Sequence, residues 1–370
     1  MNLSIKILIA VVIGFIVLGC IIVLTASGTY SFWRFNNFYR LFQSHLWKVC
    51  AAVLGMIIFS FIPYEKYRDY TKPALVGIII VLVLTFFIAP KVKGAQRWID
   101  LGVIQFQPSE AAKVILIAHL AVMLERMKDL IKDFKNGFML TLIWIAAVSI
   151  LVLIQPNIST GLIVAITSFS ILYVAGARVK HLAGVIVPTS IVAGSAIMLF
   201  NHSRERVMTF ITSLIEGGNI NKQVLQAKIA LGSGGIFGVG LGHSRQSDLF
   251  LPEAYGDFIF SVVGEELGFI GTVSVLVAFI FLFVVCLIIA KNAQNTFGKL
   301  LVMGLGFNII ISALINAAVV TGIVPTTGIT LPFISFGGTS IILFAVSIGI
   351  IINVGRQTLA TDNQKMTVQK

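Results

Sequence analysis

The carboxylate of Asp257 stands directly before a long apolar run, in Leu251-Pro-Glu-Ala-Tyr-Gly-Asp-Phe-Ile-Phe260. At the edge of an apolar layer a carboxylate loses part of its water, which raises its affinity for a proton and suits it to act as a general base. An aspartate before an apolar run is also the usual N-cap of a helix, and spacing alone favours that structural role. Asp257 is therefore a candidate base with a structural alternative.

A second group of charges opens another apolar run. Glu110 and Lys113 are three residues apart, so they share a helix face and can form an ion pair, either at a functional site or as a structural pair near the membrane interface. Arg97 precedes them beside Trp98. An arginine next to a tryptophan is a common interfacial anchor, and its guanidinium can also hold two phosphate oxygens.

Two stretches rich in glycine break the apolar pattern. The run Gly232-Ser-Gly-Gly-Ile-Phe-Gly-Val-Gly-Leu-Gly242 has neither dinucleotide-binding nor phosphate-loop spacing, which leaves a mobile loop or a backbone that packs or binds closely. The run 321–339 contains Pro325, Pro332 and four glycines. It cannot be a continuous helix, so it predicts a broken or re-entrant segment that lines a cavity.

The composition shows what must position these residues. Of 370 residues, 57% are hydrophobic and only 11% are charged, whereas soluble domains have about 25% charged residues. The mean hydropathy is +0.98. These values exclude a disordered chain, a coiled coil and a soluble nucleic-acid-binding domain, and they predict an all-α polytopic membrane protein.

Ten apolar runs are long enough to be transmembrane helices. They are approximately Ile7–Ala26, His45–Ile62, Pro73–Ala89, Ser109–Leu124, Phe138–Ile154, Ser159–Ala177, His181–Phe200, Phe258–Ala290, Leu300–Thr321 and Gly338–Val354. We expect a single membrane domain over 1–356, a long extracytoplasmic loop over 201–257 between the seventh and eighth spans, and a short cytoplasmic tail over 357–370.

The basic residues predict the orientation. The net charge is +12, and the Lys and Arg residues of the short loops concentrate on the side that holds both termini, which predicts cytoplasmic termini. Apolar residues recur every three to four positions over 124–138 and over 207–215. These patterns predict a helix on the cytoplasmic surface and another on the outer side.

The histidines and cysteines show no catalytic or metal-binding pattern. The five histidines lack metal-ligand spacing, and neither a Ser-His-Asp nor a Cys-His set is visible. Cys20, Cys50 and Cys286 lie in apolar runs, so we expect small buried hydrophobic side chains rather than a disulfide or a metal site.

Several of these segments together resemble the SEDS family of peptidoglycan glycosyltransferases, which includes FtsW and RodA. The matching stretches are Ala95-Gln-Arg-Trp-Ile-Asp-Leu-Gly102, Gln107-Pro-Ser-Glu110 with Lys113, Gln226-Ala-Lys-Ile-Ala-Leu-Gly-Ser-Gly-Gly235, Leu251-Pro-Glu-Ala254, Asp257-Phe-Ile-Phe260, Gly264-Glu-Glu-Leu-Gly268 and Pro325-Thr-Thr-Gly-Ile-Thr-Leu-Pro-Phe-Ile-Ser-Phe-Gly-Gly338. They cover nearly the whole chain. The run Gly240-Leu-Gly-His-Ser-Arg-Gln246 and the run Leu251-Pro-Glu-Ala254 are more similar to FtsW than to RodA.

The sequence departs from the family pattern at two positions. Gly256 replaces a threonine that often precedes the key aspartate, and Asn157 replaces an aspartate in the Gln155-Pro-Asn157 run. The second departure removes an expected carboxylate and puts in doubt a role for that position as a metal ligand or base. It leaves Asp257 unaffected.

The resemblance implies polymerisation of lipid II into glycan strands at the outer face of the bacterial cytoplasmic membrane, during cell division or elongation, with Asp257 as the general base. It implies as partners a class B penicillin-binding protein (a transpeptidase) and other divisome or elongasome membrane proteins, within the membrane lipid and at the division septum. Nucleic acid is not an expected partner.

The residues expected to bind substrate are Arg97, Trp98, Gln107, Ser109, Glu110, Lys113, Lys228, Ser233, Glu253 and Ser335. The family is also thought to be helped by a divalent cation such as Mg²⁺ or Mn²⁺, although the sequence offers no ligand set.

Two alternatives remain at this stage. A lipid II flippase could use the same charged cavity, and a non-catalytic scaffold of the cell-wall complex could need no chemistry. A flippase needs polar groups in both leaflets, whereas the broken and polar segments here crowd the outer side. A scaffold would tolerate the loss of Asp257.

Overall fold

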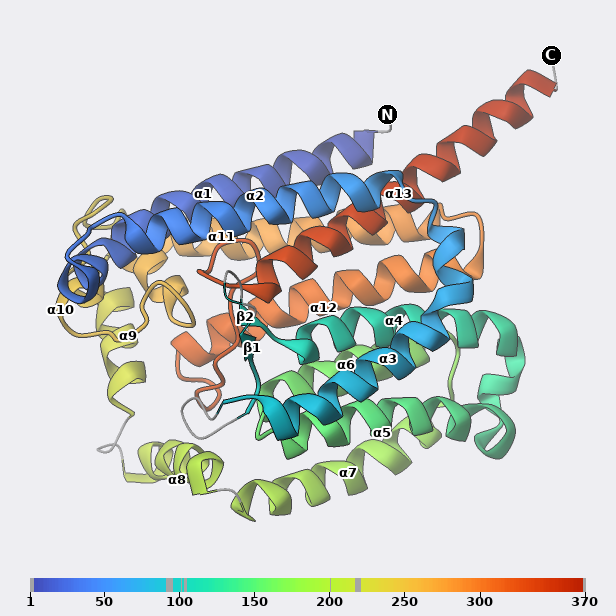
Figure 1. Cartoon of the computed structure of the whole chain (residues 1–370), viewed down its shortest axis with the longest axis horizontal. Helices are drawn as coiled ribbons and strands as arrows, with labels where there is room; N and C mark the ends of the chain where they lie inside the picture. The colour runs from blue at the N-terminus through green and yellow to red at the C-terminus, as the bar shows by residue number, and fades with distance from the viewer. Residues whose placement is uncertain are drawn as a thin grey trace.

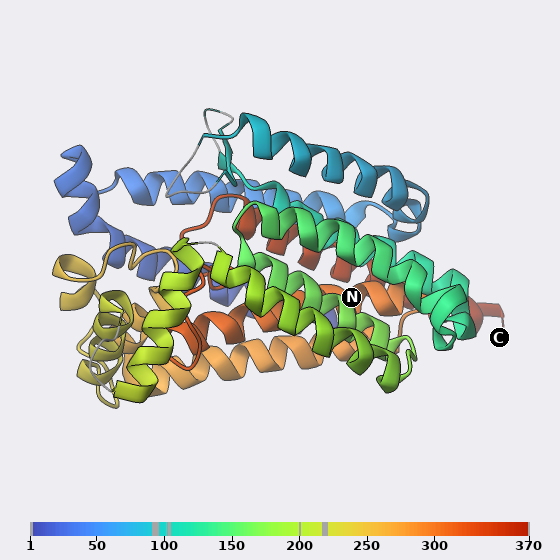
Figure 2. The ribbon, with the colours of Figure 1, turned by 90° about the horizontal axis from the view of Figure 1, so that it is seen from below.

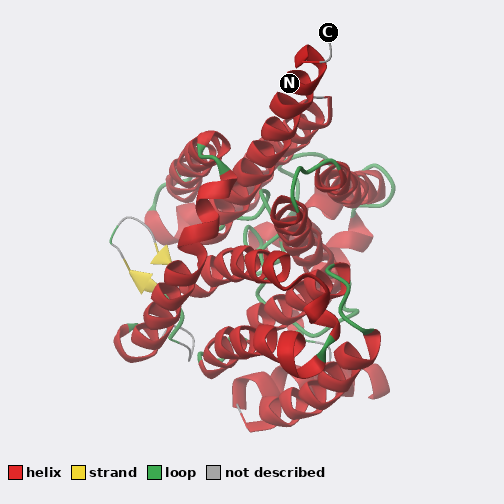
Figure 3. Cartoon of the chain, turned by 90° about the vertical axis from the view of Figure 1, so that its right-hand side faces the viewer, coloured by secondary structure: helices red, strands yellow, loops and turns green. Residues whose placement is uncertain are grey.

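The structure is a computed structural model that describes residues 3–90, 96–100, 102, 105–199, 201–216 and 221–368. Apart from two short paired strands, its regular elements are helices (Figures 1 and 3). The helices are α1 (Leu3–Phe35), α2 (Arg40–Phe61), η1 (Tyr64–Lys66), α3 (Tyr67–Ile88), α4 (Pro108–Met127), η2 (Lys128–Lys132), η3 (Phe134–Phe138), α5 (Met139–Ile154), α6 (Ile158–Val174), α7 (Val179–Leu199), α8 (Asn201–Glu216), α9 (Lys222–Ser233), α10 (Arg245–Leu249), α11 (Ile259–Lys291), α12 (Thr296–Val320) and α13 (Thr339–Val368). The strands β1 (Ile99–Asp100) and β2 (Gln105–Phe106) pair antiparallel.

Each of the ten predicted spans is a helix, which confirms the helical polytopic fold. Seven helical segments are apolar and long enough to cross a membrane by length and composition, and α6 is a shorter apolar helix. Of the other two, α4 carries Glu110 and Lys113 near its start and Glu125 and Arg126 near its end, so it is more polar than the rest.

The helices α12 and α13 form the centre of the bundle and are its most buried spans. α12 packs against α4, α6 and α11, and α13 packs mainly against α2. Gly304 allows α12 to approach α4 and α6 closely, because a Cβ at this position would overlap the side chains of Ile117 and Ile171. The loops that carry the candidate site residues are therefore attached to tightly packed helices.

The two ends of the bundle differ. Both chain ends lie at one end of the molecule, while α8, α9 and α10 lie at the other (Figures 1 and 2). This placement agrees with the prediction that the termini and the loop 201–257 lie on opposite sides. The tail predicted over 357–370 continues α13 as a helix to Val368.

Two sequence expectations were wrong. The stretch 124–138 is not one surface helix: α4 ends at Met127, Lys128 has a φ of +47°, and one 3₁₀ turn and one π turn follow. The side chain of Asp133 accepts backbone hydrogen bonds that start the second turn, which a regular helix would not allow. Of the cysteines, only Cys286 is buried; Cys20 is half-buried and Cys50 is exposed.

The segment between α12 and α13 is non-helical and enters the bundle, as the prolines and glycines predicted. Leu331, Phe333 and Ile334 are buried, and a Cβ on Gly19 of α1 would lie 2.8 Å from the Cα of Ile334. The segment thus reaches the middle of α1. An irregular backbone at this depth is tolerated because protein, not lipid, surrounds it.

Candidate active site

Asp257 lies in the turns just before α11. The helix begins at Ile259, its N-cap is Phe258, and no side chain caps it. The N-cap interpretation of Asp257 was therefore wrong, although spacing alone favoured it. The carboxylate is half-buried, and a Cβ on Gly328 would lie 3.3 Å from its Oδ2 atom. Gly328 thus brings the broken segment up to the carboxylate.

Three hydrogen bonds fix the backbone around Asp257 to the broken segment and to α12. The Asn316 side-chain amide donates to the Asp257 carbonyl oxygen at 2.8 Å. The hydroxyl of Ser335 donates to the carbonyl of Gly256 at 2.8 Å, and the backbone N–H of Phe336 donates to the carbonyl of Tyr255 at 2.9 Å. These contacts fix the backbone carbonyls of residues 255–257 and so position the carboxylate.

Arg206 interacts electrostatically both with Asp257 and with Arg97. Burial lowers the pKa of Arg206 on α8, and the negative charge of Asp257 partly opposes that effect. Burial also lowers the pKa of Arg97 to about 10, with a further contribution from the positive charge of Arg206. Arg206 therefore has a carboxylate as one charged neighbour and a second guanidinium as the other, so an anion and a proton donor could both be accommodated near it.

Backbone carbonyls position both arginines. Arg97 donates from Nε to the carbonyl of Gln155 at 3.1 Å and from Nη2 to the carbonyl of Pro156. Arg206 donates from Nη1 to the carbonyl of Thr326 at 3.3 Å. A guanidinium has five N–H groups, so both arginines keep donors for a ligand.

Lys228 adds a third positive charge. It lies on α9 against Gly322, where a Cβ would stand 2.7 Å from its Nζ atom. Lys228 and Arg206 line one small cavity, together with Phe210, Ser213, Asn221, Val224, Gly322, Val324, Pro325 and Thr326. Helices α8 and α9 thus bring two cations to the same edge of the broken segment.

The predicted pair of charges on α4 forms. Lys113 Nζ lies 2.8 Å from Glu110 Oε1, and both side chains are almost fully buried. The same end of α4 is tied to its surroundings: the hydroxyl of Thr339 accepts from the backbone N–H of Gln107 at 2.8 Å, and Ser109 accepts from the amide of Asn157 at 3.2 Å. Asn157 thus keeps a hydrogen bond at the position where the family often has aspartate.

A further hydrogen bond joins the start of α6 to the broken segment. The hydroxyl of Ser159 donates to the carbonyl of Thr327 at 2.6 Å. Since Thr327 adjoins Gly328, the contacts from Ser109 through Asn157 and Ser159 lead from α4 to the vicinity of Asp257. These hydrogen bonds therefore connect the start of α4, the start of α6 and the broken segment, which lie far apart in the sequence.

Several predicted substrate-binding residues are engaged in internal contacts. Ser335 is 2% exposed, and its hydroxyl also accepts from the N–H of Leu331. Ser233 donates to the carbonyl of Ala230 and to Glu265, 3.4 Å away. Glu253 has a φ of +59° in the loop before Asp257, and Trp98 is half-buried beside Arg97.

The glycine-rich run packs on a kink in α11. Gly268 has a φ of +69° and interrupts that helix, and Gly238 lies against the Glu266 carbonyl so closely that a Cβ would overlap it. Glu265 accepts from the Ser244 hydroxyl and from two backbone N–H groups of α10, while Glu266 accepts from Thr25 and Gly242. The two glutamates and the glycines therefore hold the segment 232–246 against the kink of α11.

One polar cluster was missed by the sequence analysis. Lys48 on α2 lies 3.9 Å from the ring centre of Phe336, and His45, one turn earlier, is fully buried with neither ring nitrogen hydrogen-bonded among the described residues. Phe336 in turn packs against Tyr255. The available signal was a lysine within an apolar span, which is costly unless it serves a function.

A metal site would need several His, Cys, Asp or Glu side chains close together. The described residues contain no group of three or more His, Cys, Asp or Glu side chains placed to hold a metal ion. They therefore do not fit a resident metal centre, and no chemical step below depends on one.

The matches to known proteins agree with this arrangement. A family model described as "Cell cycle protein", covering FtsW, RodA and SpoVE, matches residues 5–360. The chain belongs to the FtsW/RodA/SpoVE family. It is 35% identical to "Probable peptidoglycan glycosyltransferase FtsW" of Geobacter metallireducens, over 93% of this chain and 92% of that protein. It is 32% identical to "Peptidoglycan glycosyltransferase MrdB" of Escherichia coli, over 85% of each.

Solved structures of the FtsW/RodA/SpoVE type share the fold. One chain, from a structure described as "Structural coordination of polymerization and crosslinking by a peptidoglycan synthase complex", aligns with a TM-score of 0.78 and 24% identity, over 95% of this chain and 97% of that one. RodA of Thermus thermophilus aligns with a TM-score of 0.70 and 23% identity, over 95% and 96% of the two chains. This family member is therefore a multi-pass inner-membrane protein.

Proposed function

We propose that this protein is a peptidoglycan glycosyltransferase that polymerises lipid II into glycan strands at the outer face of the cytoplasmic membrane, with Asp257 as the general base. One observation carries the proposal: a half-buried carboxylate lies against Gly328 of the broken segment and interacts with Arg206, in a chain whose family relatives bear that activity in their names. This is the acid–base and anion-binding pair that glycosyl transfer from a lipid pyrophosphate needs.

The proposed step is a substitution at the anomeric carbon of the donor sugar. The acceptor hydroxyl oxygen forms a bond to that carbon, and the bond from the carbon to the pyrophosphate oxygen breaks. The electron pair leaves with the pyrophosphate, while the hydroxyl proton passes to the Asp257 carboxylate. General-base help of this kind typically contributes about 10²–10⁴-fold to the rate.

The leaving pyrophosphate needs positive charge, which Arg206 and Lys228 supply on one side of Asp257. Arg97 adds its remaining donors, and its contacts to residues 155–156 fix its direction before substrate arrives. We assign Lys113 the same anion-binding role from α4, with Glu110 holding its ammonium group. Arginine suits such a role because its planar fork matches phosphate oxygens.

We also propose the setting. The termini face the cytoplasm, and α8, α9 and α10 face outward, as the distribution of short-loop lysines and arginines predicts. The division septum and the FtsW branch follow from the run 240–246. A transpeptidase of class B is the proposed partner, because one aligned structure is described as coordinating polymerisation and crosslinking.

The test is glycan-strand formation from purified lipid II, with and without the cognate transpeptidase. Asp257→Asn should lower the rate at least about 10²-fold while expression and partner binding stay normal. Asp248→Asn on α10 is the matched control: its carboxylate accepts from Thr29, which an amide oxygen can also do. Near-normal polymerisation by Asp257→Asn would reject the catalytic assignment and would favour the flippase or scaffold hypothesis instead.

A further inference from the structure

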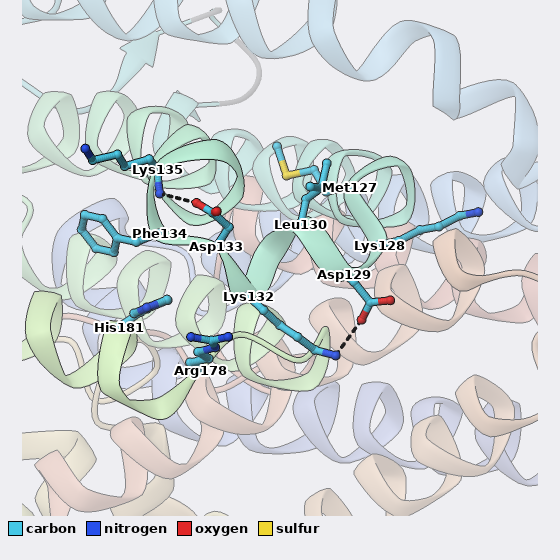
Figure 4. A pocket seen from close by; sticks show the side chains of 10 residues that line it. All are labelled: Met127, Lys128, Asp129, Leu130, Lys132, Asp133, Phe134, Lys135, Arg178 and His181. Carbon is cyan, nitrogen blue, oxygen red and sulfur yellow. Dashed lines mark hydrogen bonds and ion pairs between the residues drawn. The ribbon is translucent and has the colours of Figure 1, made fainter.

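A hollow of about 790 Å³ lies at the end of the bundle that holds the termini, away from the proposed active site (Figures 1 and 4). It is walled by two segments far apart in the sequence, the turns between α4 and α5 and the start of α7. The lining residues are Met127, Lys128, Asp129, Leu130, Lys132, Asp133, Phe134, Lys135, Arg178 and His181.

The shape of this hollow is built into the fold. Ile131 and Phe138 are buried and anchor the two turns. Gly137 lies directly against the carbonyl of Leu130, where a Cβ would overlap. His181 packs its ring against Phe134, with ring centres 5.3 Å apart, and so joins the second wall to the first. The hollow is therefore preformed rather than a gap between loose loops.

The two carboxylates of the hollow, Asp129 and Asp133, already have partners within the protein. Asp129 forms an ion pair with Lys132 at 2.6 Å, and that hydrogen bond lowers the pKa of Asp129. Asp133 accepts from the backbone N–H of Asn136, which lowers its pKa, and Arg178 adds to this effect. Both acids stay ionised at neutral pH and hold the walls together.

The positive charges exceed these carboxylates. Lys128, Lys132, Lys135 and Arg178 face two aspartates, and within the described part of the chain Lys128, Lys135 and Arg178 have no carboxylate within 4 Å. Figure 4 shows the ammonium groups of Lys128 and Lys135 pointing away from one another, while Arg178 lies in the second wall beside the Lys132 side chain. Arg178 and Lys132 therefore line the hollow from its two walls, and the flexible Lys128 and Lys135 side chains flank it.

Exposed apolar side chains stand beside these cations. Leu130 is 56% exposed, Phe134 40% and Val179 63%, although they lie at the ends of membrane-spanning helices. A soluble anion would leave these apolar side chains exposed to water. A molecule with a phosphate and an acyl chain fits both parts, because the phosphate meets the cations while the chain covers the apolar groups.

We propose that this hollow binds the headgroup phosphate of an anionic phospholipid. The site is separate from the lipid II chemistry and does not depend on it. The lipid would fix the connection between α4 and α5 to the membrane surface. Since α4 carries the Glu110–Lys113 pair at its other end, a bound lipid would also steady that helix.

The test uses the full-length protein in detergent, titrated with phosphatidylglycerol or phosphatidylcholine and measured by native mass spectrometry. Phosphatidylglycerol should bind and phosphatidylcholine should not. Lys128→Gln/Arg178→Gln should weaken phosphatidylglycerol binding at least about fivefold, since each cation near a lipid surface contributes about 1 kcal/mol. Lys291→Gln/Lys299→Gln removes the same charge from exposed positions at the end of α11 and the start of α12 and should leave binding unchanged.

Three outcomes would overturn the proposal. An equal loss in both double variants would mean diffuse surface charge rather than a site. Displacement of the lipid by millimolar inorganic phosphate would mean a site for a soluble anion. Unchanged phosphatidylglycerol binding by Lys128→Gln/Arg178→Gln would mean that the lipid binds elsewhere on the protein and not in this hollow. Thermal unfolding of both variants checks that each is folded.

Discussion

The side-chain amide of Asn316 donates one hydrogen bond to the carbonyl of Asp257 at 2.8 Å and another to the carbonyl of Ile329 at 2.7 Å. Asn316 is 1% exposed and lies on α12, in the centre of the bundle. One buried amide therefore joins the loop of the proposed base to the broken segment that brings Gly328 against it. Asn316 is a positioning residue, since it acts through Asp257.

We predict that Asn316→Asp lowers polymerisation at least about tenfold, chiefly in kcat, because a carboxylate cannot donate to either carbonyl and repels both. Steady-state rates at several lipid II concentrations separate kcat from KM. The control is Asn308→Asp, a buried asparagine two turns earlier on the same helix. Both changes should lower the unfolding temperature, but only the first should lower kcat in the protein that remains folded. Equal losses of kcat would mean that Asn316 is merely structural.

The ion pair on α4 gives a second prediction. Lys113→Ala leaves Glu110 buried without its partner, which typically costs about 3–5 kcal/mol of stability, so activity should fall for two reasons. Glu110→Ala/Lys113→Ala should recover much of the stability but not the activity. Lys299→Ala, on the surface of α12, should change neither. Recovery of polymerisation by the double variant would mean that the Glu110–Lys113 pair is not part of the active site.

The sequence analysis was most successful where composition alone decides the outcome. The ten apolar runs had to be helices in lipid, and Pro325 and Pro332 had to interrupt the helix that contains them. Spacing also predicted the contact of Glu110 with Lys113, since residues three apart on a helix are neighbours. These inferences need no knowledge of tertiary packing.

It failed where two local arrangements were equally compatible with the pattern. The apolar period over 124–138 fits a helix, but Asp133 uses backbone N–H groups that a helix would need. The aspartate before α11 fits a cap, but the helix begins one residue later. Nor could spacing single out Arg206, because α8 has to fold back over the broken segment before that arginine comes near Asp257.

A third prediction concerns the departure at Asn157. The amide of this side chain donates to the Ser109 hydroxyl at 3.2 Å, and an aspartate could instead accept from that hydroxyl. Arg97, which binds the carbonyls of the two preceding residues, is a nearby counter-charge. We therefore expect Asn157→Asp to retain polymerisation within about threefold, because the hydrogen bond reverses rather than disappears. Asn157→Leu removes it and should lower activity more; similar rates for both would show that this contact is dispensable.

Sidedness can be tested by labelling an exposed residue of the predicted outer loop. Ser244 lies in that loop but is unsuitable, because it is 2% exposed and hydrogen-bonded to Glu265. His243 beside it is exposed, as is Lys299 at the other end of the bundle. Because Cys50 is also exposed, the labelling background must first carry Cys50→Ser. A membrane-impermeant maleimide added to intact cells should label His243→Cys and spare Lys299→Cys. The reverse pattern would invert the orientation.

The last prediction compares two glycines in the run that covers α11. Gly238 and Gly240 have φ angles of +83° and +98°, so alanine is strained at both, by about 1–2 kcal/mol. Only Gly238 also abuts backbone, namely the Glu266 carbonyl and the N atom of Gly268; a Cβ on Gly240 would meet only His243, at 3.5 Å. Gly238→Ala should therefore lower the thermal midpoint further than Gly240→Ala, because overpacking adds about 1–3 kcal/mol. It should also slow polymerisation, since it displaces the part of α11 that follows Asp257. If the two variants unfold at the same temperature, the left-handed backbone alone explains these glycines, and the close approach of the loop to the kink contributes nothing measurable.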